Sequence, residues 1–121
     1  MKSFILQKAL SVAKNSQMER GKVGAVLFTN SGQIITFANN VYYDGDDNKR
    51  SVHAEEYVIA KMIRLRAISR FKGLNLLVVR YKISNDNLAM ARPCIKCAKL
   101  LQRFPEIKVY YSNEFGEIIK F

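Results

Sequence analysis

The sequence lacks tryptophan and has only one histidine, two cysteines and two prolines among its 121 residues. Two cysteines are too few for a disulfide framework in a chain of this length. No apolar run approaches the roughly 20 residues that a membrane-spanning helix requires. Gln7 and Lys8 interrupt the short apolar cluster near the amino end, so a signal peptide is not indicated either. We therefore expect a cytoplasmic protein with reduced cysteines and no membrane partner.

Acidic residues are also scarce, because 10 Asp and Glu stand against 20 Lys and Arg, a formal net charge of +10. A positive field of this size attracts polyanions. The basic residues are spread along the chain, with only short clusters such as "RLRAISRFK" at 64–72. The charge is therefore compatible with ordinary solvated helix faces and with a surface for a phosphate backbone. The missing tryptophan removes one obvious platform for stacking bases.

Nothing in the sequence separates a second structural unit. Apolar residues make up 49% of the chain, and there is no Gly/Ser/Pro-rich linker, low-complexity segment or internal repeat. A chain of this size and composition is typical of one domain with one hydrophobic core. We therefore expect a single domain over residues 1–121.

Hydrophobic periodicity and turn residues predict an alternation of helices and strands. Ser3 is a candidate cap for a helix with apolar positions Leu6, Ala9, Leu10 and Ala13. The other expected elements are a β-hairpin over 22–29 and 33–40, a polar loop over 41–50, a helix over 51–68, a buried strand over 74–79, an extended hairpin or loop over 84–92, a helix over 94–104 with Pro93 in its first turn, a strand over 107–112 and a possible short terminal strand.

The order α-β-β-α-β-α-β is typical of an α/β domain. We expect the first hairpin to be antiparallel and the later strands to be parallel, joined by right-handed crossovers. The predicted architecture is a three-layer α/β/α domain around a mixed sheet of about five strands. A two-layer α+β arrangement of the same elements remains an alternative.

The motif "PCIKC" places Cys94 and Cys97 three residues apart near the start of a predicted helix. Residues at this spacing project from one face of a helix. The partial positive charge at a helix N-terminus favours thiolate, the form that binds metal. Alone, the spacing also fits a redox pair or two small buried hydrophobic residues.

A zinc site becomes the favoured interpretation when "HAE" at residues 53–55 is added. Zinc is four-coordinate, and catalytic sites leave one of the four positions for water. His53, Cys94 and Cys97 supply three ligands, and the chain has no further histidine or cysteine. We therefore predict one Zn²⁺ per chain with an open position, at which a bound water has a lowered pKa.

Glu55 is the candidate catalytic residue. Two residues apart on a regular helix, His53 and Glu55 would point about 200° apart, given 3.6 residues per turn. Both can serve one site only if His53 stands at the entry of the helix, and Ser51 is a possible start signal there. Glu55 can then take a proton from water and return it to a leaving group. Its neighbour Glu56 is expected to face solvent or an arginine.

The combination "HAE … PCIKC" resembles the His-x-Glu … Pro-Cys-x-x-Cys signature of zinc deaminases that act on nucleobases. The chain is similar, over nearly its full length, to the cytidine/deoxycytidylate deaminase superfamily. The resemblance implies a cytidine deaminase-like fold, with zinc on His53, Cys94 and Cys97 and Glu55 as proton shuttle. It also implies attack of activated water on C4 of cytosine with loss of ammonia, and a base that faces the backbone of Ala54.

The resemblance also bears on the end of the second predicted strand with the loop after it, and on the residue before Pro93. The sequence "FANN" lies where these enzymes keep an asparagine that contacts the sugar, and strand ends favour Asn40 over Asn39; an asparagine at an ordinary strand-to-loop turn is the alternative. Tyr42 and Tyr43 are candidates for stacking on a base or for anchoring the loop. Arg92 departs from the family, many members of which have glutamate or serine before the proline.

The substrate is left open by the sequence. The favoured function is deamination of cytosine in a free nucleoside or nucleotide: cytidine, deoxycytidine or dCMP. The alternatives are deamination of cytosine, less readily adenine, in single-stranded DNA or RNA, and a catalytically silent zinc module that binds nucleic acid or protein. Glu55 argues against the last, because a structural zinc site has no use for a carboxylate facing water. A homo-oligomer is possible, with the second helix as a contact.

Overall fold

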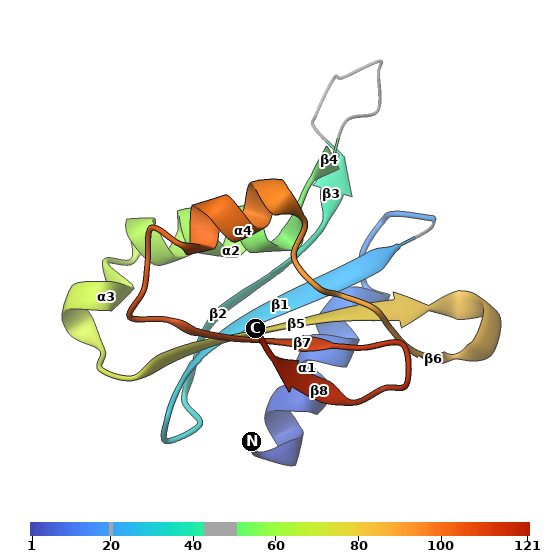
Figure 1. The fold of residues 1–121 in the computed structure, drawn as a ribbon, viewed down its shortest axis with the longest axis horizontal. Helices are drawn as coiled ribbons and strands as arrows, with labels where there is room; N and C mark the ends of the chain where they lie inside the picture. The colour runs from blue at the N-terminus through green and yellow to red at the C-terminus, as the bar shows by residue number, and fades with distance from the viewer. Residues whose placement is uncertain (20, 43–50) are drawn as a thin grey trace.

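The structure is a computed structural model that describes residues 1–19, 21–42 and 51–121. It consists of a twisted sheet with helices on both faces (Figure 1). The elements in chain order are α1 (Ser3–Lys14), β1 (Lys22–Thr29), β2 (Ile34–Asn39), β3 (Val41–Tyr42), β4 (Ser51–Val52), α2 (Ala54–Arg64), α3 (Ala67–Arg70), β5 (Leu74–Lys82), the 3₁₀ helix η1 (Ile83–Asn85), β6 (Asn87–Ala89), α4 (Ile95–Leu101), β7 (Lys108–Ser112) and β8 (Ile118–Lys120).

The main sheet is mixed, with the order β2-β1-β5-β7-β8 and with β6 paired to β5. β1 is antiparallel to β2 and to β5, whereas β5 and β7 are parallel. The predicted antiparallel hairpin and the later parallel pair are therefore confirmed, and β6 brings the sheet to six strands where about five were expected. β3 and β4 form a separate antiparallel pair, so Val41 and Tyr42, predicted to be loop, are extended.

The predicted three layers are confirmed, and the two-layer alternative is wrong. Helix α1 covers one face of the sheet, and α2, α3 and α4 cover the other (Figure 1). Side chains alternate between the two faces of a strand. In β1, Leu27 packs in the core beneath α2, while Val26 packs in the core beneath α1. β1 and β5 are consequently buried on both sides. The continuous apolar run over 74–79 predicted this for β5, whereas β1 was expected only as one strand of the hairpin.

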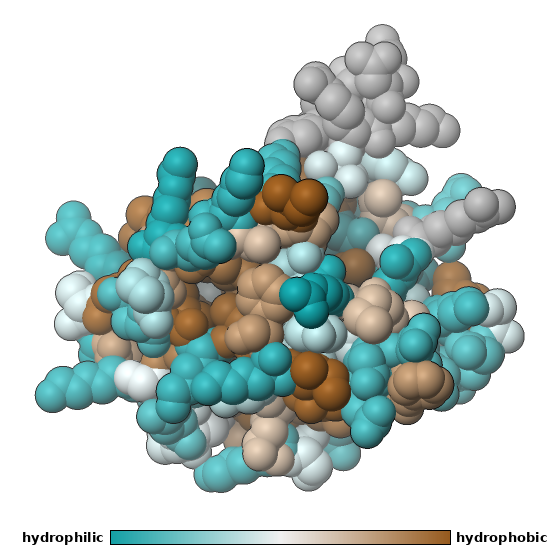
Figure 2. Space-filling model, in the orientation of Figure 1, coloured by the Kyte–Doolittle hydropathy of each residue, from teal (hydrophilic) through white to brown (hydrophobic). Residues whose placement is uncertain are grey.

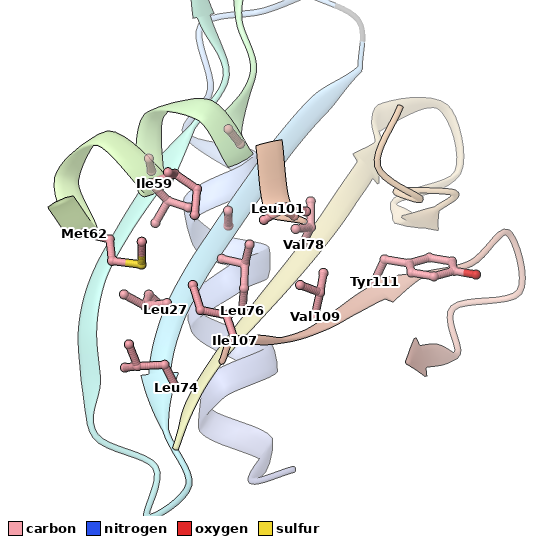
Figure 3. Packing of buried hydrophobic residues seen from close by; sticks show 14 of the residues in the cluster. Leu27, Ile59, Met62, Leu74, Leu76, Val78, Leu101, Ile107, Val109 and Tyr111 are labelled. Atoms are coloured by element: carbon pink, nitrogen blue, oxygen red, sulfur yellow. The ribbon is translucent and has the colours of Figure 1, made fainter. Parts of the chain in front are cut away.

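The core beneath α2 and α4 joins these two helices to the sheet. In Figure 3, Ile59 and Met62 from α2 and Leu101 from α4 point toward Leu76 and Val78 of β5. All five side chains are buried. Burying each such side chain stabilises the fold by about 1.5–3 kcal/mol. The shared core therefore fixes α2 and α4 on the sheet, and with them the amino ends of both helices.

Helix α1 lies unusually close to β1 at Gly24. A Cβ added to Gly24 would lie 2.6 Å from both the backbone nitrogen of Ala13 and the carbonyl oxygen of Ala9. Only glycine permits this approach. The helix begins at Ser3 with Lys2 at the cap position, so the expected Ser3 cap is not formed. Its buried residues are Ile5, Ala9, Val12 and Ala13, a set that differs from the predicted face at Leu6 and Leu10.

The predicted helix over 51–68 is shorter and is interrupted. Ser51 lies in β4, and α2 begins at Ala54 with His53 as its N-cap. The helix ends at Arg64, and Arg66 then adopts a left-handed conformation with φ of 53° before the single turn of α3. No glycine or proline marks this break, which is why periodicity alone extended the helix through it.

The last helix is also shorter than predicted. α4 begins at Ile95 with Cys94 as its N-cap, so Pro93 precedes the helix and does not occupy its first turn. Past Leu101 the chain continues in tighter turns, with Phe104 N–H donating to the Leu101 carbonyl at 3.0 Å. The expected extended hairpin over 84–92 is present as β6, which pairs with the end of β5. The short terminal strand is present as β8.

Over the described parts of the chain, no helix combines the length and apolar character needed to cross a bilayer. The face shown in Figure 2 carries mostly hydrophilic side chains, with separate hydrophobic patches between them.

Candidate active site

His53 lies at the point where the extended chain of β4 turns into α2. Its backbone is extended, with φ of −68° and ψ of 149°, as expected for an N-cap. The His53 N–H donates to Oε1 of Glu56 at 3.2 Å, which closes the first turn. Glu56 also pairs with Lys96 of α4 at 3.3 Å, so its partner is a lysine and not the expected arginine. The predicted position of His53 at the helix entry is therefore observed.

The three predicted metal ligands come together. Nδ1 of His53 lies 3.2 Å from Sγ of Cys97 and 3.7 Å from Sγ of Cys94. All three ligand atoms lie within 4.8 Å of one another. Tetrahedral zinc with ordinary Zn–N and Zn–S bonds places nitrogen and sulfur about 3.6 Å apart. The donor set and its spacing therefore fit zinc, and no other His, Cys, Asp or Glu of the described residues joins this group.

The two cysteines differ in their surroundings. Cys94 is exposed at the N-cap of α4, whereas Cys97 is fully buried one turn later. Burial, with smaller contributions from the nearby charges of Glu55 and Cys94, raises the pKa of the Cys97 thiol well above its ordinary value. Without metal, burial of Cys97 therefore opposes the thiolate that the helix terminus was expected to favour. A coordinated cation reverses this preference, since it deprotonates a thiol ligand.

Glu55 lies on the first turn of α2, close to the ligand group, and only 5% of its surface is exposed. Burial raises the pKa of its carboxyl, and hydrogen bonding to its own backbone, the charge of His53 and a hydrogen bond with Cys97 partly oppose this shift. A buried carboxyl whose pKa is raised holds a proton more readily than an exposed one, which suits a group that accepts a proton and returns it.

A cavity of about 220 Å³ adjoins these residues. The start of α2 supplies His53, Ala54 and Glu55 to its wall, and Cys94 lies there as well. Ala54 is fully buried as the first residue of α2. The first N–H groups of a helix have no acceptor within the helix. The cavity is thus lined on this side by a carboxyl, a thiol, an imidazole and helix-terminal N–H groups.

Asn40 forms part of the opposite wall and is buried. Its Oδ1 accepts from the N–H of Val23 at 2.9 Å and lies 2.8 Å from the Ser16 hydroxyl, while its Nδ2 donates to the carbonyl of Gly21 at 2.7 Å. These bonds fix the amide and leave one N–H of Nδ2 for a ligand. Asn39 instead donates to the carbonyl of Val12 at 3.1 Å and does not line the cavity.

Sequence reasoning missed several cavity-lining residues, Arg80 and Met90 among them, and left the role of Arg92 open. Arg92 precedes "PCIKC" and so had a signal in the motif, whereas Arg80 stands one residue past a strand predicted to end at Val79. The Arg92 guanidinium donates to the Tyr111 hydroxyl at 3.4 Å and lies 5.3 Å from the ring centre of Phe121.

The two tyrosines proposed for stacking have different outcomes. Tyr42 pairs with Ser51 in the β3–β4 ribbon and is not among the residues that line the cavity. Tyr43 lies outside the described residues.

Comparison with known proteins agrees with this geometry. Residues 1–113 match the family model described as the cytidine and deoxycytidylate deaminase zinc-binding region. A search of curated proteins found no significant match.

Solved structures share the fold. A cytidine deaminase from Burkholderia pseudomallei is 17% identical with a TM-score of 0.70, over 100% of this chain and 91% of that one. A dCMP deaminase from the cyanophage S-TIM5 is 25% identical with a TM-score of 0.58, over 94% of this chain and 86% of that one. The same phage enzyme in complex with dCMP and dUMP is 24% identical with a TM-score of 0.59, over 94% and 85%. With the family match over residues 1–113, the chain belongs to the cytidine and deoxycytidylate deaminase family.

Proposed function

We propose that the protein is a zinc-dependent hydrolytic deaminase that converts cytosine to uracil in a free nucleoside or nucleotide such as cytidine, deoxycytidine or dCMP. The observation that carries this proposal is the convergence of His53, Cys94 and Cys97 next to a buried glutamate, at the wall of a cavity. The family match and the fold shared with cytidine and dCMP deaminases support it. We further infer that residues 1–121 act as one domain.

His53, through Nδ1, and the thiolates of Cys94 and Cys97 would hold one zinc ion per chain. When bound, zinc supplies a Lewis acid that lowers the pKa of water in its fourth position. Two thiolates balance the charge of the ion. The rigid placement of the three ligands at the starts of α2 and α4 supports this assignment, because catalysis requires ligands that keep their geometry.

Glu55 would move the proton. Its carboxylate takes a proton from the attacking water and delivers it to the amino group on C4, which leaves as ammonia. Water adds to C4 and the C4–N bond breaks, so cytosine and water give uracil and ammonia. The raised pKa of Glu55 supports this role, because a carboxyl that accepts a proton more readily can take it in the first step and return it in the second.

Asn40 and Ala54 would orient the substrate. The remaining N–H of Asn40 Nδ2 is available to a sugar hydroxyl, and the fixed amide costs little further ordering when a ligand binds. The backbone at Ala54 faces the cavity at the helix start, where N–H groups can meet the polar edge of a base.

Deamination of cytosine in single-stranded nucleic acid is the second candidate. The net charge of +10 favours it, because neutralising phosphates supplies most non-specific affinity for nucleic acid. The third interpretation, a silent zinc module, gives no reason for a buried glutamate beside the ligand group.

The test of the proposed function combines metal analysis with an ammonia assay. The purified protein should contain one zinc per chain and should release ammonia from at least one of cytidine, deoxycytidine, dCMP and an oligonucleotide with one dC. Zinc without ammonia from any of the four would favour the silent module, and protein that binds no zinc would remove the proposed mechanism.

A further inference from the structure

A second, larger cavity of about 690 Å³ continues from the cavity of the candidate active site. Arg80 and Met90 line both of them, so the two are neighbours. Glu19 and Gly21 from the loop that follows α1 and Lys22 at the start of β1 line one part of it, and the end of the β5–β6 hairpin lines another. Figure 1 shows this loop and this hairpin at the same end of the sheet. We call this second cavity the side groove.

Arg80 lies where the two cavities meet, and its position depends on a backbone hydrogen bond and on the space that Gly21 leaves open. Its N–H donates to the Ser112 hydroxyl at 3.2 Å, and Ser112 in turn donates to the carbonyl of Ala89 at 2.7 Å. The guanidinium lies over Gly21, where an added Cβ would be 3.2 Å from Nη2. Gly21 also accepts the hydrogen bond from Asn40, so the guanidinium lies beside the residue proposed to meet the sugar.

The charges of the side groove suit an anion. Of the residues that the structure describes, Arg80, Lys22 and Lys82 line it together with one carboxylate, that of Glu19. Lys22 donates to the Ser16 carbonyl. Arg80 forms no ion pair with any carboxylate of the described residues, so its guanidinium has donors left for a ligand.

Arg92, the other arginine beside the catalytic cavity, is oriented differently. Its guanidinium packs against the rings of Tyr111 and Phe121, and Arg92 does not line the side groove. Among the arginines of the described residues, Arg80 is therefore the one that lines both cavities.

We propose that the side groove binds a phosphate attached to the nucleoside in the catalytic cavity, and that Arg80 determines the preference for phosphorylated substrates. This inference rests on the proposed function. A guanidinium presents paired N–H donors that match the oxygens of a phosphate. The phosphate is either the terminal group of a mononucleotide or the link to a neighbouring nucleotide.

The size of the side groove admits both sources of phosphate. Its volume lies within the range of about 300–1,000 Å³ that pockets for whole small molecules occupy, which is more than one phosphate fills. Ile83 and Met90 are 55% and 43% exposed and line the groove, so an apolar surface is also available to a second base.

The test compares kcat/KM for deoxycytidine, dCMP and a short oligonucleotide with one dC, in the wild type, in Arg80→Gln and in Arg103→Gln. Arg103 is an exposed arginine past the end of α4 that lines neither cavity, so it controls for loss of one positive charge. We expect the wild type to prefer a phosphorylated substrate at least tenfold. Arg80→Gln should lower that preference by about 10–100-fold, as expected for hydrogen bonds to a charged group, and Arg103→Gln should keep it.

The comparison of dCMP with the oligonucleotide separates the two sources of phosphate. A preference for dCMP identifies a terminal phosphate, and a preference for the oligonucleotide identifies an internucleotide one; either supports the inference. If the oligonucleotide is preferred, its log affinity should decrease with log salt concentration, and the magnitude of this slope should be about 0.7 smaller in Arg80→Gln than in the wild type. Equal turnover of deoxycytidine and both phosphorylated substrates would overturn the inference, as would an equal loss on all three in Arg80→Gln.

A binding measurement keeps this inference separate from the proposed function. Titration of dUMP and deoxyuridine into the zinc-loaded protein should show tighter binding of dUMP, with the difference reduced in Arg80→Gln. If no substrate releases ammonia, the proposed function fails while this titration still decides whether the side groove binds phosphate. Equal affinity for dUMP and deoxyuridine, together with no salt-dependent oligonucleotide binding, would refute the inference.

Discussion

The ligand group, made of His53, Cys94 and Cys97, and the side groove are neighbouring regions that different kinds of structural element form. His53 and Cys97 are brought together by the starts of two helices that share one buried core, and their neighbours in the sequence form recognisable motifs. The side groove is formed by a loop and a hairpin whose exposed residues, such as Lys82 and Ile83, belong to no motif. The difference separates the residues assigned to reaction chemistry from those assigned to substrate choice. Variants of Glu55, Cys97 and Asn40 test these assignments, and a variant outside both regions serves as a comparison.

The largest effect is expected from Glu55→Gln. Removing the group that moves the proton should lower kcat by about 10²–10⁴-fold, the range for general acid–base catalysis. The zinc content should stay at one per chain because Glu55 is not a ligand. Ammonia release and metal analysis on the same preparation measure both quantities. Glu114→Gln, at an exposed glutamate in the turn before β8, is the matched control. Activity within tenfold of the wild type would exclude Glu55 from the mechanism.

Cys97→Ser should remove the stabilisation by zinc. Metal binding contributes to folding free energy when the unfolded chain lacks the site, and free zinc at 1,000 times its Kd raises the free energy of unfolding by about 4 kcal/mol. Denaturant unfolding with and without zinc should show this increase in the wild type and none in Cys97→Ser. An equal increase in both proteins would place the zinc elsewhere.

Asn40→Ala should affect both substrate binding and stability. The change leaves the Val23 N–H and the Gly21 carbonyl without their partner, which costs about 1–3 kcal/mol for a buried polar group. We expect kcat/KM to fall about 10–100-fold, mainly through KM, if the amide also meets the sugar. Steady-state kinetics should show no such change in Asn39→Ala, whose amide bonds only to α1. Equal kinetics for the two variants would assign Asn40 a structural role alone.

The smallest effect on chemistry is expected from Gly24→Ala, which lies outside both regions. The added methyl meets the backbone of α1, and such overpacking costs about 1–3 kcal/mol. Denaturant unfolding should show this loss, while zinc content stays unchanged. Unchanged stability would mean that α1 can move away from β1 without cost.

Much of the fold could be predicted because its strongest signals are local. The continuous apolar run of β5 predicted a buried strand, the two β-rich runs around "NSG" predicted the β1–β2 hairpin, and "HAE" with "PCIKC" predicted the ligand group that the structure brings together. The break at Arg66 could not be predicted, since a left-handed residue other than glycine leaves no mark in the sequence. The raised pKa of Cys97 was missed because it depends on burial by residues distant in the chain.

The role of Arg80 also lay beyond sequence reasoning. Its position depends on Gly21 and Ser112, about 60 residues before it and about 30 after it in the chain. Contacts at such separations are set by sheet topology and not by any short pattern. The substrate preference proposed from Arg80 therefore depends on contacts that the sequence alone could not reveal.

The central claim is tested most directly by X-ray absorption at the zinc edge of the purified protein. The account predicts two sulfur ligands at about 2.3 Å and two nitrogen or oxygen ligands at about 2.0–2.1 Å, one from His53 and one from solvent. A zinc ion with fewer than two sulfur ligands, or a protein that retains no zinc, would contradict it.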